Sequence, residues 1–157
     1  MMASDVLARA GAAYVHELSF MVCIAALTAE RIWIQANPNK QTATKLIITD
    51  IIYGLFALLL LLSGIARVLH YGQGTDFYTQ NPLFWWKVGL YLTAGALSLY
   101  PTITYISWAI PLRKDELPKV NDVVANRIGW VINIELVAFA SLPFMASLMA
   151  RGVGLPS

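Results

Sequence analysis

The sequence predicts an all-α integral membrane protein, a single-domain four-helix bundle with up-and-down topology. Of its 157 residues 58% are hydrophobic and 13% are charged, and the mean hydropathy is +0.62. A soluble domain has about 25% charged residues. Four apolar stretches approach the roughly 20 residues that a helix needs to cross a hydrocarbon core of about 30 Å. They are residues 13–35, 46–70, 83–110 and 125–149, and the short connections between them favour antiparallel neighbours.

The first stretch is apolar but carries Glu17 near its beginning and Glu30 near its end. A cleavable signal peptide is the alternative interpretation, and it would have a cationic start and an uninterrupted apolar centre. Here Asp5 offsets Arg9, and Glu17 interrupts the apolar run. We therefore expect the segment to be retained as a transmembrane helix.

The second and third stretches contain long uncharged runs, Ile51–Ala66 and Val88–Leu112, whereas the fourth is interrupted by Glu135. Residues typical of turns support the boundaries between the stretches. They are Asn37-Pro38, Gly72-Gln73-Gly74, Asn81-Pro82 and Pro111.

The distribution of cations predicts the orientation. The connections after the first and third helices contain Lys40, Lys45, Arg113, Lys114 and Lys119, whereas the middle connection contains only Asp76. By the positive-inside rule both termini then lie on the non-cytoplasmic side of the membrane. No basic run or phosphate-binding loop is present, so nucleic acid is not an expected partner. The single cysteine, Cys23, excludes an intramolecular disulfide and a thiolate metal cluster.

Ionisable residues within the helices are expected in two layers. His16, Arg67, Lys87 and His70 lie near the outer ends, and Glu30, Asp50 and Glu135 lie toward the cytoplasmic side. A charge at mid-bilayer costs about 2.5–3.5 kcal/mol on insertion scales, so these groups should point inward and find partners. The helical period places His16 and Glu30 on one stripe, and a second stripe runs from Lys87 through Tyr91 to Tyr105.

Structural interpretations remain open for both layers. Arg67, His70 and Lys87 could extend their polar ends to the membrane surface. Glu30 and Asp50 could form an ion cluster with Arg31. Glu135 lies about 15 Å into its helix and needs a partner. The candidates are Arg127, Asn133, Tyr53 and a water molecule.

The outer layer has the residue types of a haem b site. A neutral imidazole is an axial ligand of haem iron, and interfacial Arg or Lys can pair with the propionates. We expect His16 as the metal ligand and five further residues in cofactor binding: Lys87, Arg67, His70, Phe20 and Tyr91. A copper site is an alternative that would use His16, His70, Met145 and Met149.

Two stretches carry a resemblance to known proteins. DIIYGLFALLLLLSGIARV and FYTQNPLFWWKVGLYLTAGALSLYPTITYISW, residues 50–68 and 77–108, resemble an uncharacterised family of bacterial four-helix membrane proteins. More distantly, the first-helix histidine with WWKVGL is similar to the HemJ-type protoporphyrinogen oxidases and to CopD-like copper-resistance membrane proteins. The HemJ resemblance implies a haem b-binding membrane oxidoreductase in which His16 and Lys87 are the essential catalytic pair.

Together these observations predict electron transfer or porphyrin and quinone redox chemistry. The expected partners are the lipid bilayer, further copies of the chain and a quinone or other redox partner. The alternative function is a non-catalytic membrane subunit or a small proton or cation transporter that uses Glu30, Asp50 and Glu135.

Overall fold

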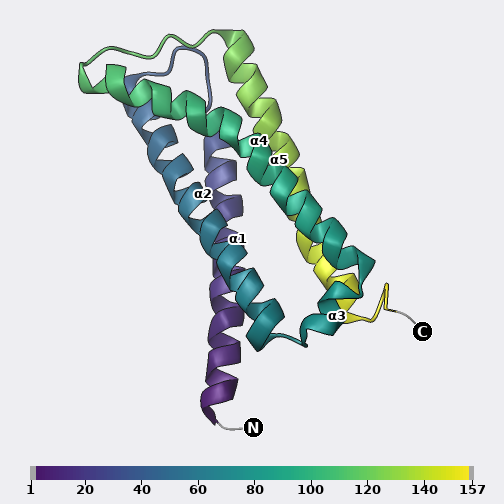
Figure 1. Cartoon of the computed structure of the whole chain (residues 1–157). Coiled ribbons are helices and arrows are strands. Elements are labelled where there is room, and N and C mark those ends of the chain that lie inside the picture. The colour runs from purple at the N-terminus through teal and green to yellow at the C-terminus, as the bar shows by residue number, and fades with distance from the viewer. Residues whose placement is uncertain (1–2, 156–157) are drawn as a thin grey trace.

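The computed structural model describes residues 3–155, in which all regular secondary structure is helical (Figure 1). The helices are α1 (Ala3–Trp33), α2 (Lys40–Ala66), α3 (Thr75–Thr79), α4 (Pro82–Arg113) and α5 (Asp122–Ala150). A π-helical turn, η1 (Arg67–Tyr71), continues α2. The predicted all-α class is confirmed.

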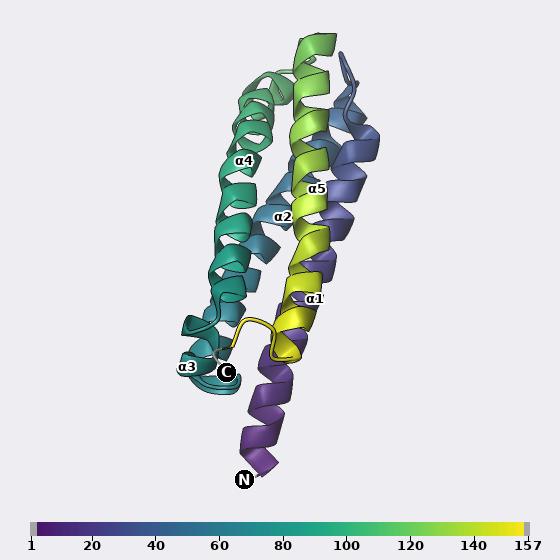
Figure 2. The ribbon, with the colours of Figure 1, turned by 90° about the vertical axis from the view of Figure 1, so that its right-hand side faces the viewer.

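The long helices run up and down an elongated molecule (Figures 1 and 2). The most extensive contacts are between α1 and α2 and between α4 and α5, and α1 also contacts α5, as α2 contacts α4. Both ends of the chain lie at the same end of the molecule, which we call the terminal end (Figure 1). The opposite end contains the connections 34–39 and 114–121, and we call it the cation-rich end because Lys40, Lys114 and Lys119 lie there.

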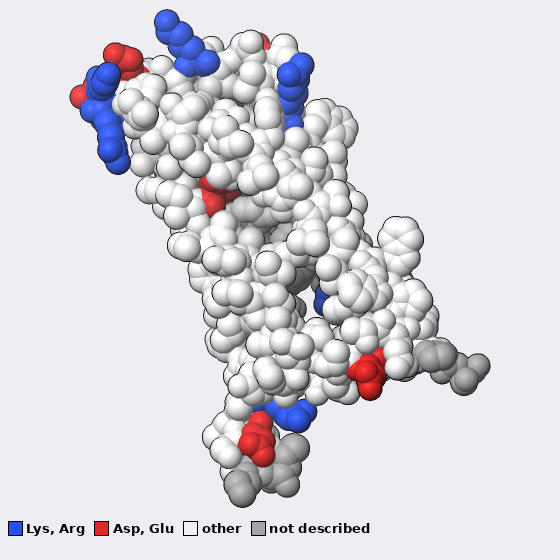
Figure 3. All heavy atoms as spheres, in the orientation of Figure 1, with Lys and Arg blue, Asp and Glu red and all other residues white. Residues whose placement is uncertain are grey.

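Within residues 3–155, three helices are long and apolar enough to cross a membrane: α1, the continuous span Lys40–Tyr71, and α5. The 32 residues of α4 do not meet the same hydropathy criterion, because Tyr, Thr, Ser, Gly and Pro are interspersed among its apolar residues. Large apolar side chains are exposed on the outer faces of the helices, and the space-filling surface between the two charged ends is largely uncharged (Figure 3). Examples are Leu55, Leu58, Leu62, Ile103, Ile106, Val137 and Phe144. This distribution suits contact with lipid.

Asparagine residues determine where three helices begin. The side-chain oxygens of Asn39, Asn81 and Asn121 accept hydrogen bonds from the backbone N–H groups of Thr42, Leu83 and Val124, at 2.8, 2.9 and 2.9 Å. Asparagine is among the best N-cap residues because its side chain satisfies an N–H group that has no partner within the helix. Pro82 then occupies the first turn of α4, where a missing N–H costs nothing.

The helices differ from the predicted ones at the starts of α1 and α2 and in the middle connection. Helix α1 begins at Ala3 rather than near residue 13, and α2 begins at Lys40 rather than near residue 46. Hydropathy locates the apolar part of a helix, whereas Ala, Leu, Arg, Lys and Gln continue the helix into water because of their high propensity. The middle connection, predicted as a loop, contains part of η1 and α3.

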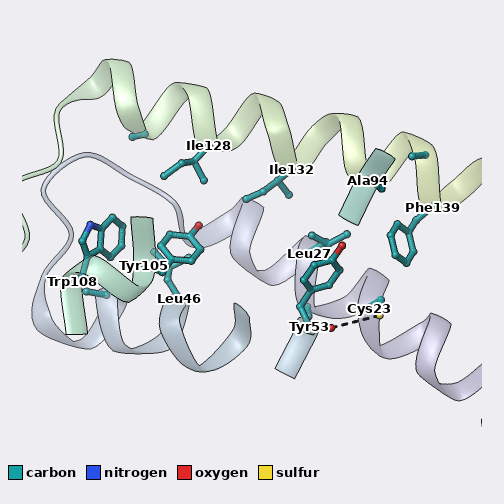
Figure 4. Close-up of a cluster of buried hydrophobic side chains, with 14 of the residues drawn as sticks. Cys23, Leu27, Leu46, Tyr53, Ala94, Tyr105, Trp108, Ile128, Ile132 and Phe139 are labelled. Carbon is teal, nitrogen blue, oxygen red and sulfur yellow. Dashed lines mark hydrogen bonds between the residues drawn. The ribbon is translucent and has the colours of Figure 1, made fainter. Parts of the chain in front are cut away.

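Phe139 of α5 lies at the centre of the core. Its ring centroid is 5.9 Å from Phe20 of α1, 6.2 Å from Tyr53 of α2 and 6.1 Å from Tyr91 of α4. Figure 4 shows this ring directed from α5 into the interior. The predicted stripes are confirmed: Cys23, Leu27 and Glu30 of α1 are buried, as are Ala94, Ser98, Pro101 and Tyr105 of α4.

The C-terminal turn is attached to the start of α4. Asn81 is fully buried, and besides capping α4 it donates from Nδ2 to the backbone oxygen of Val153 at 2.9 Å. Gly154, with φ of +87°, passes so close that a Cβ there would lie 2.6 Å from the Asn81 Oδ1. Glycine is therefore required at this position.

Candidate functional site

His16 lies in α1 and faces α2. Its Nδ1 is 3.1 Å from the backbone oxygen of Leu60 and 3.0 Å from the Ser63 Oγ. The Ser63 hydroxyl itself donates to the Leu60 oxygen at 3.1 Å. A carbonyl oxygen can only accept, so Nδ1 carries the hydrogen in the tautomer that satisfies this contact. Nε2 then holds the lone pair that a metal needs.

Gly64 makes this approach possible. A Cβ at position 64 would lie 3.1 Å from Cε1 and 3.6 Å from Nδ1 of His16. The absence of a side chain at Gly64 therefore forms a recess in α2 that holds one edge of the His16 ring.

Two cations lie near this histidine. Arg67 begins η1 and Lys87 lies in α4, and both side chains are half-buried. Both lie close enough for their charges to act on the His16 ring, and Arg67 acts in the same way on Lys87. The ion pair found within residues 3–155 joins Lys40 to Asp115 at the cation-rich end. Within these residues, therefore, neither Arg67 nor Lys87 forms an ion pair with a carboxylate. Figure 3 shows basic side-chain atoms recessed within a hollow between the two ends.

Phe20 and Tyr91 lie one helical turn from His16 and Lys87, toward the middle of the molecule. Phe20 stacks on Phe139, and the Tyr91 hydroxyl donates to the backbone oxygen of Ala57 at 2.5 Å. Both rings are therefore held in place by contacts with other helices. The structure brings two of the predicted residues, Arg67 and Lys87, close to His16, whereas Phe20 and Tyr91 both pack on Phe139.

His70 lies elsewhere. It is exposed in η1 and lines a surface pocket together with Arg9, whose Nη1 donates to the Gly72 oxygen at 3.1 Å. His16 instead contacts α2 about two to three turns before His70, at Leu60 and Ser63. The structure therefore does not bring the two histidines together, either as joint haem ligands or as part of a copper site.

The three acids form a second cluster, the acidic cluster, defined here as Glu30, Asp50 and Glu135. They are 1%, 6% and 0% exposed. Asp50 accepts a hydrogen bond from Thr102 Oγ1 at 2.8 Å, and Glu135 Oε1 lies 3.4 Å from the Tyr53 hydroxyl. Among the partners expected for Glu135, the structure selects Tyr53.

The ion cluster that the sequence allowed around Arg31 does not form. The Arg31 Nε donates to Asn133 Oδ1 at 2.8 Å, and the guanidinium packs against Gly129. Both partners lie on α5, and the Arg31 side chain is exposed. No group of three His, Cys, Asp or Glu side chains within residues 3–155 lies close enough together to hold a metal ion.

Comparison with known proteins decides the family. A family described as "Predicted membrane protein (DUF2214)" matches residues 8–154. The chain belongs to this family. No curated protein and no solved structure matches it. The DUF2214 match confirms the membrane-protein prediction, and it includes the His16 site and the acidic cluster.

Three residues in this DUF2214 protein were not assigned to a site from the sequence. Ser63 and Gly64 position His16, and Tyr105 of α4 lies beside the acidic cluster. The helical spacing from Lys87 had already placed Tyr105 on the inward stripe. For Ser63 and Gly64 the sequence contains no comparable signal, because their role depends on how α1 is aligned against α2.

Proposed function

We propose that the protein is an integral membrane haem b-binding protein, with His16 as the axial ligand, that serves electron transfer or porphyrin and quinone redox chemistry. The observation that carries the proposal is the orientation of His16. Histidines that bind metals usually donate their other ring N–H to a carbonyl or carboxylate, which fixes the tautomer. The contact of Nδ1 with the Leu60 oxygen is an arrangement of this kind.

The surrounding residues suit a haem. Arg67 and Lys87 supply half-buried positive charges for the two propionates. Phe20 and Tyr91 present aromatic surface on the side toward the core. When bound, haem supplies reversible one-electron chemistry. The chain itself orients the imidazole through Leu60 and Ser63, and Arg67 and Lys87 would pair with the propionates.

The proposal includes a membrane arrangement. Helix α4 would be the fourth span, since its 32 residues correspond to about 48 Å of helical rise. Both termini would lie on the non-cytoplasmic side of a bacterial inner membrane, as the loop cations predict. A quinone in the bilayer is the expected class of redox partner, and the exposed apolar faces leave room for a homo-oligomer.

The test is the visible spectrum of the detergent-purified protein, as isolated and after reduction with dithionite. We expect a Soret band and reduced α and β bands that are lost in His16→Ala. His70→Ala is the matched control, because it removes the second histidine of the chain without touching the His16 contacts, and it should retain the bands. A colourless protein from cells supplied with haem precursor would refute the proposal, as would bands that survive in His16→Ala.

The likeness of His16 and Lys87 to the HemJ-type pair makes porphyrinogen oxidation the enzymatic activity to assay. We expect quinone-dependent oxidation that is lost in Lys87→Gln and retained in Lys119→Gln, which changes an exposed lysine at the cation-rich end. Haem binding without such oxidation would restrict the function to electron transfer.

A further inference from the structure

The acidic cluster lies apart from His16, and all four long helices contribute to its surroundings. Glu30 comes from α1, Asp50 and Tyr53 from α2, and Glu135 from α5. Helix α4 contributes Thr102 and the fully buried Tyr105, which lies near all three acids. Figure 4 shows the hydroxyl groups of Tyr53 and Tyr105 directed into the interior toward α5.

The hydrogen bonds within this cluster are incomplete. Glu30 Oε1, Glu135 Oε2 and the Tyr105 hydroxyl are buried and have no hydrogen-bond partner among the described residues. The bond from Tyr53 to Glu135 is long at 3.4 Å, compared with about 2.7–2.8 Å for a typical O–H···O bond. A buried polar atom without a partner costs about 1–3 kcal/mol, so three such atoms in one place point to something that binds there.

In the part of the chain that the structure describes, the cluster also lacks a positive charge. Arg31 is bound to Asn133 and exposed, and Arg127 is exposed on α5. The other ionisable groups nearby are the hydroxyls of Tyr53 and Tyr105 and the thiol of Cys23, none of which is cationic. Three ionised carboxylates here would place a charge of about −3 in an apolar interior, which is prohibitively costly without compensation.

We propose that Glu30, Asp50 and Glu135, together with Tyr53 and Tyr105, form an intramembrane proton-binding site that exchanges protons with water at the cation-rich end. Protonation of these carboxylates would remove their negative charge and would also supply hydrogen-bond donors for the unpaired oxygens. A protonated carboxyl gains an O–H donor for a neighbouring oxygen, and its remaining oxygen can accept from the Tyr105 hydroxyl. This site is independent of the proposed haem.

The depths of the acids suggest the direction of exchange. Glu30 lies within one turn of the end of α1. Asp50 is about 15 Å along α2 from Lys40, and Glu135 is about 20 Å along α5 from Asp122, by helical rise. The acids are therefore staggered from the cation-rich end toward the middle of the molecule, as the members of a proton relay would be. Asp50 keeps the largest exposed fraction of the three.

The experiment is infrared spectroscopy of the full-length protein in lipid, recorded in H₂O and D₂O between about pH 4 and pH 10. We expect a carbonyl band of protonated carboxylic acid that persists at neutral pH, shifts in D₂O and decreases reversibly as the pH rises. Glu30→Gln, Asp50→Asn and Glu135→Gln should each remove one component of this band. Asp115→Asn is the matched control, because Asp115 is exposed and paired with Lys40, and it should remove nothing at neutral pH.

The titration of the wild-type protein decides the proposal even if a variant fails to fold. A band that is absent at neutral pH, or that neither exchanges deuterium nor titrates, would overturn it. The measurement is repeated with choline and with sodium as the only monovalent cation. A band that sodium abolishes at constant pH would identify a cation site and would equally overturn the proposal. Haem propionate bands cancel in the differences between wild type and each acid variant, so the result does not depend on haem.

Discussion

Alanine in place of Gly64 would put a methyl group against the His16 ring. The new Cβ would lie 3.1 Å from Cε1, whereas ordinary contact begins at 3.4 Å, so the ring must retreat by at least 0.3 Å. The same movement stretches the bonds from Nδ1 to Leu60 and Ser63, now 3.1 and 3.0 Å, toward the limit for hydrogen bonding. Their weakening costs about 0.5–1.5 kcal/mol. This offsets the roughly 1 kcal/mol that alanine gains over glycine in a helix.

Gly54→Ala in the same helix is the control, because nothing lies within 4 Å of a Cβ at that position. We expect the free energy of unfolding of Gly64→Ala to fall about 1 kcal/mol below that of Gly54→Ala, measured by denaturant titration in detergent. Haem affinity, measured from the Soret band during titration, should fall about 10-fold to 100-fold in Gly64→Ala alone, as for other residues that orient a metal ligand. Equal stability and equal affinity in the two variants would refute the packing of His16 against α2. A stability difference without any haem binding would refute only the haem proposal.

Three further predictions concern other parts of the molecule. Phe139→Ala should destabilise the protein by about 3–5 kcal/mol, because the ring contacts three other helices. Phe144→Ala is the control: it removes a side chain that is 65% exposed and should have little effect in the same detergent unfolding assay. The hydrogen bond and positive charge of Lys40 hold the pKa of Asp115 below its usual range, so Lys40→Ala should return that pKa to the usual range in an NMR titration. The stabilisation from this pair is present at neutral pH and disappears as Asp115 is protonated in acid. Because both side chains are exposed, the unfolding temperature should hardly change in Lys40→Ala. Lys87→Gln should weaken haem binding about tenfold while leaving the Soret band in place, and an unchanged affinity would exclude Lys87 as a propionate partner.

The inward faces of the helices could be predicted from the sequence because they depend only on helical geometry. The stripe from His16 to Glu30 and the stripe from Lys87 to Tyr105 both face inward in the structure. The start of α4 could also be predicted, from the Asn81-Pro82 pair in front of it, whereas α2 begins at Lys40 rather than near residue 46. The start of α1 was missed because hydropathy does not register helix-forming residues outside the membrane.

The pairing of side chains across helices could not be predicted. Whether His16 contacts Ser63 or His70 depends on how far α1 is shifted along α2. The helical period of each segment is the same in both cases, so the sequence does not distinguish them. In the same way Arg31 could reach Glu30 or α5, and the choice of Asn133 follows from the packing of α1 against α5. The π-helical turn Arg67–Tyr71 also departs from the 3.6-residue period on which the prediction depended.

The link between Asn81 and Val153 gives the last few residues of the chain a role in assembly. During synthesis the start of α4 emerges long before residue 153, so its buried asparagine must wait for the C-terminal turn before its Nδ2 finds this acceptor. Removal of residues 151–155 would retain every long helix and remove both the acceptor of the Asn81 Nδ2 and the Gly154 backbone that packs against this side chain. Packing of residues 153–154 against Asn81 would therefore follow the insertion of α4 and α5.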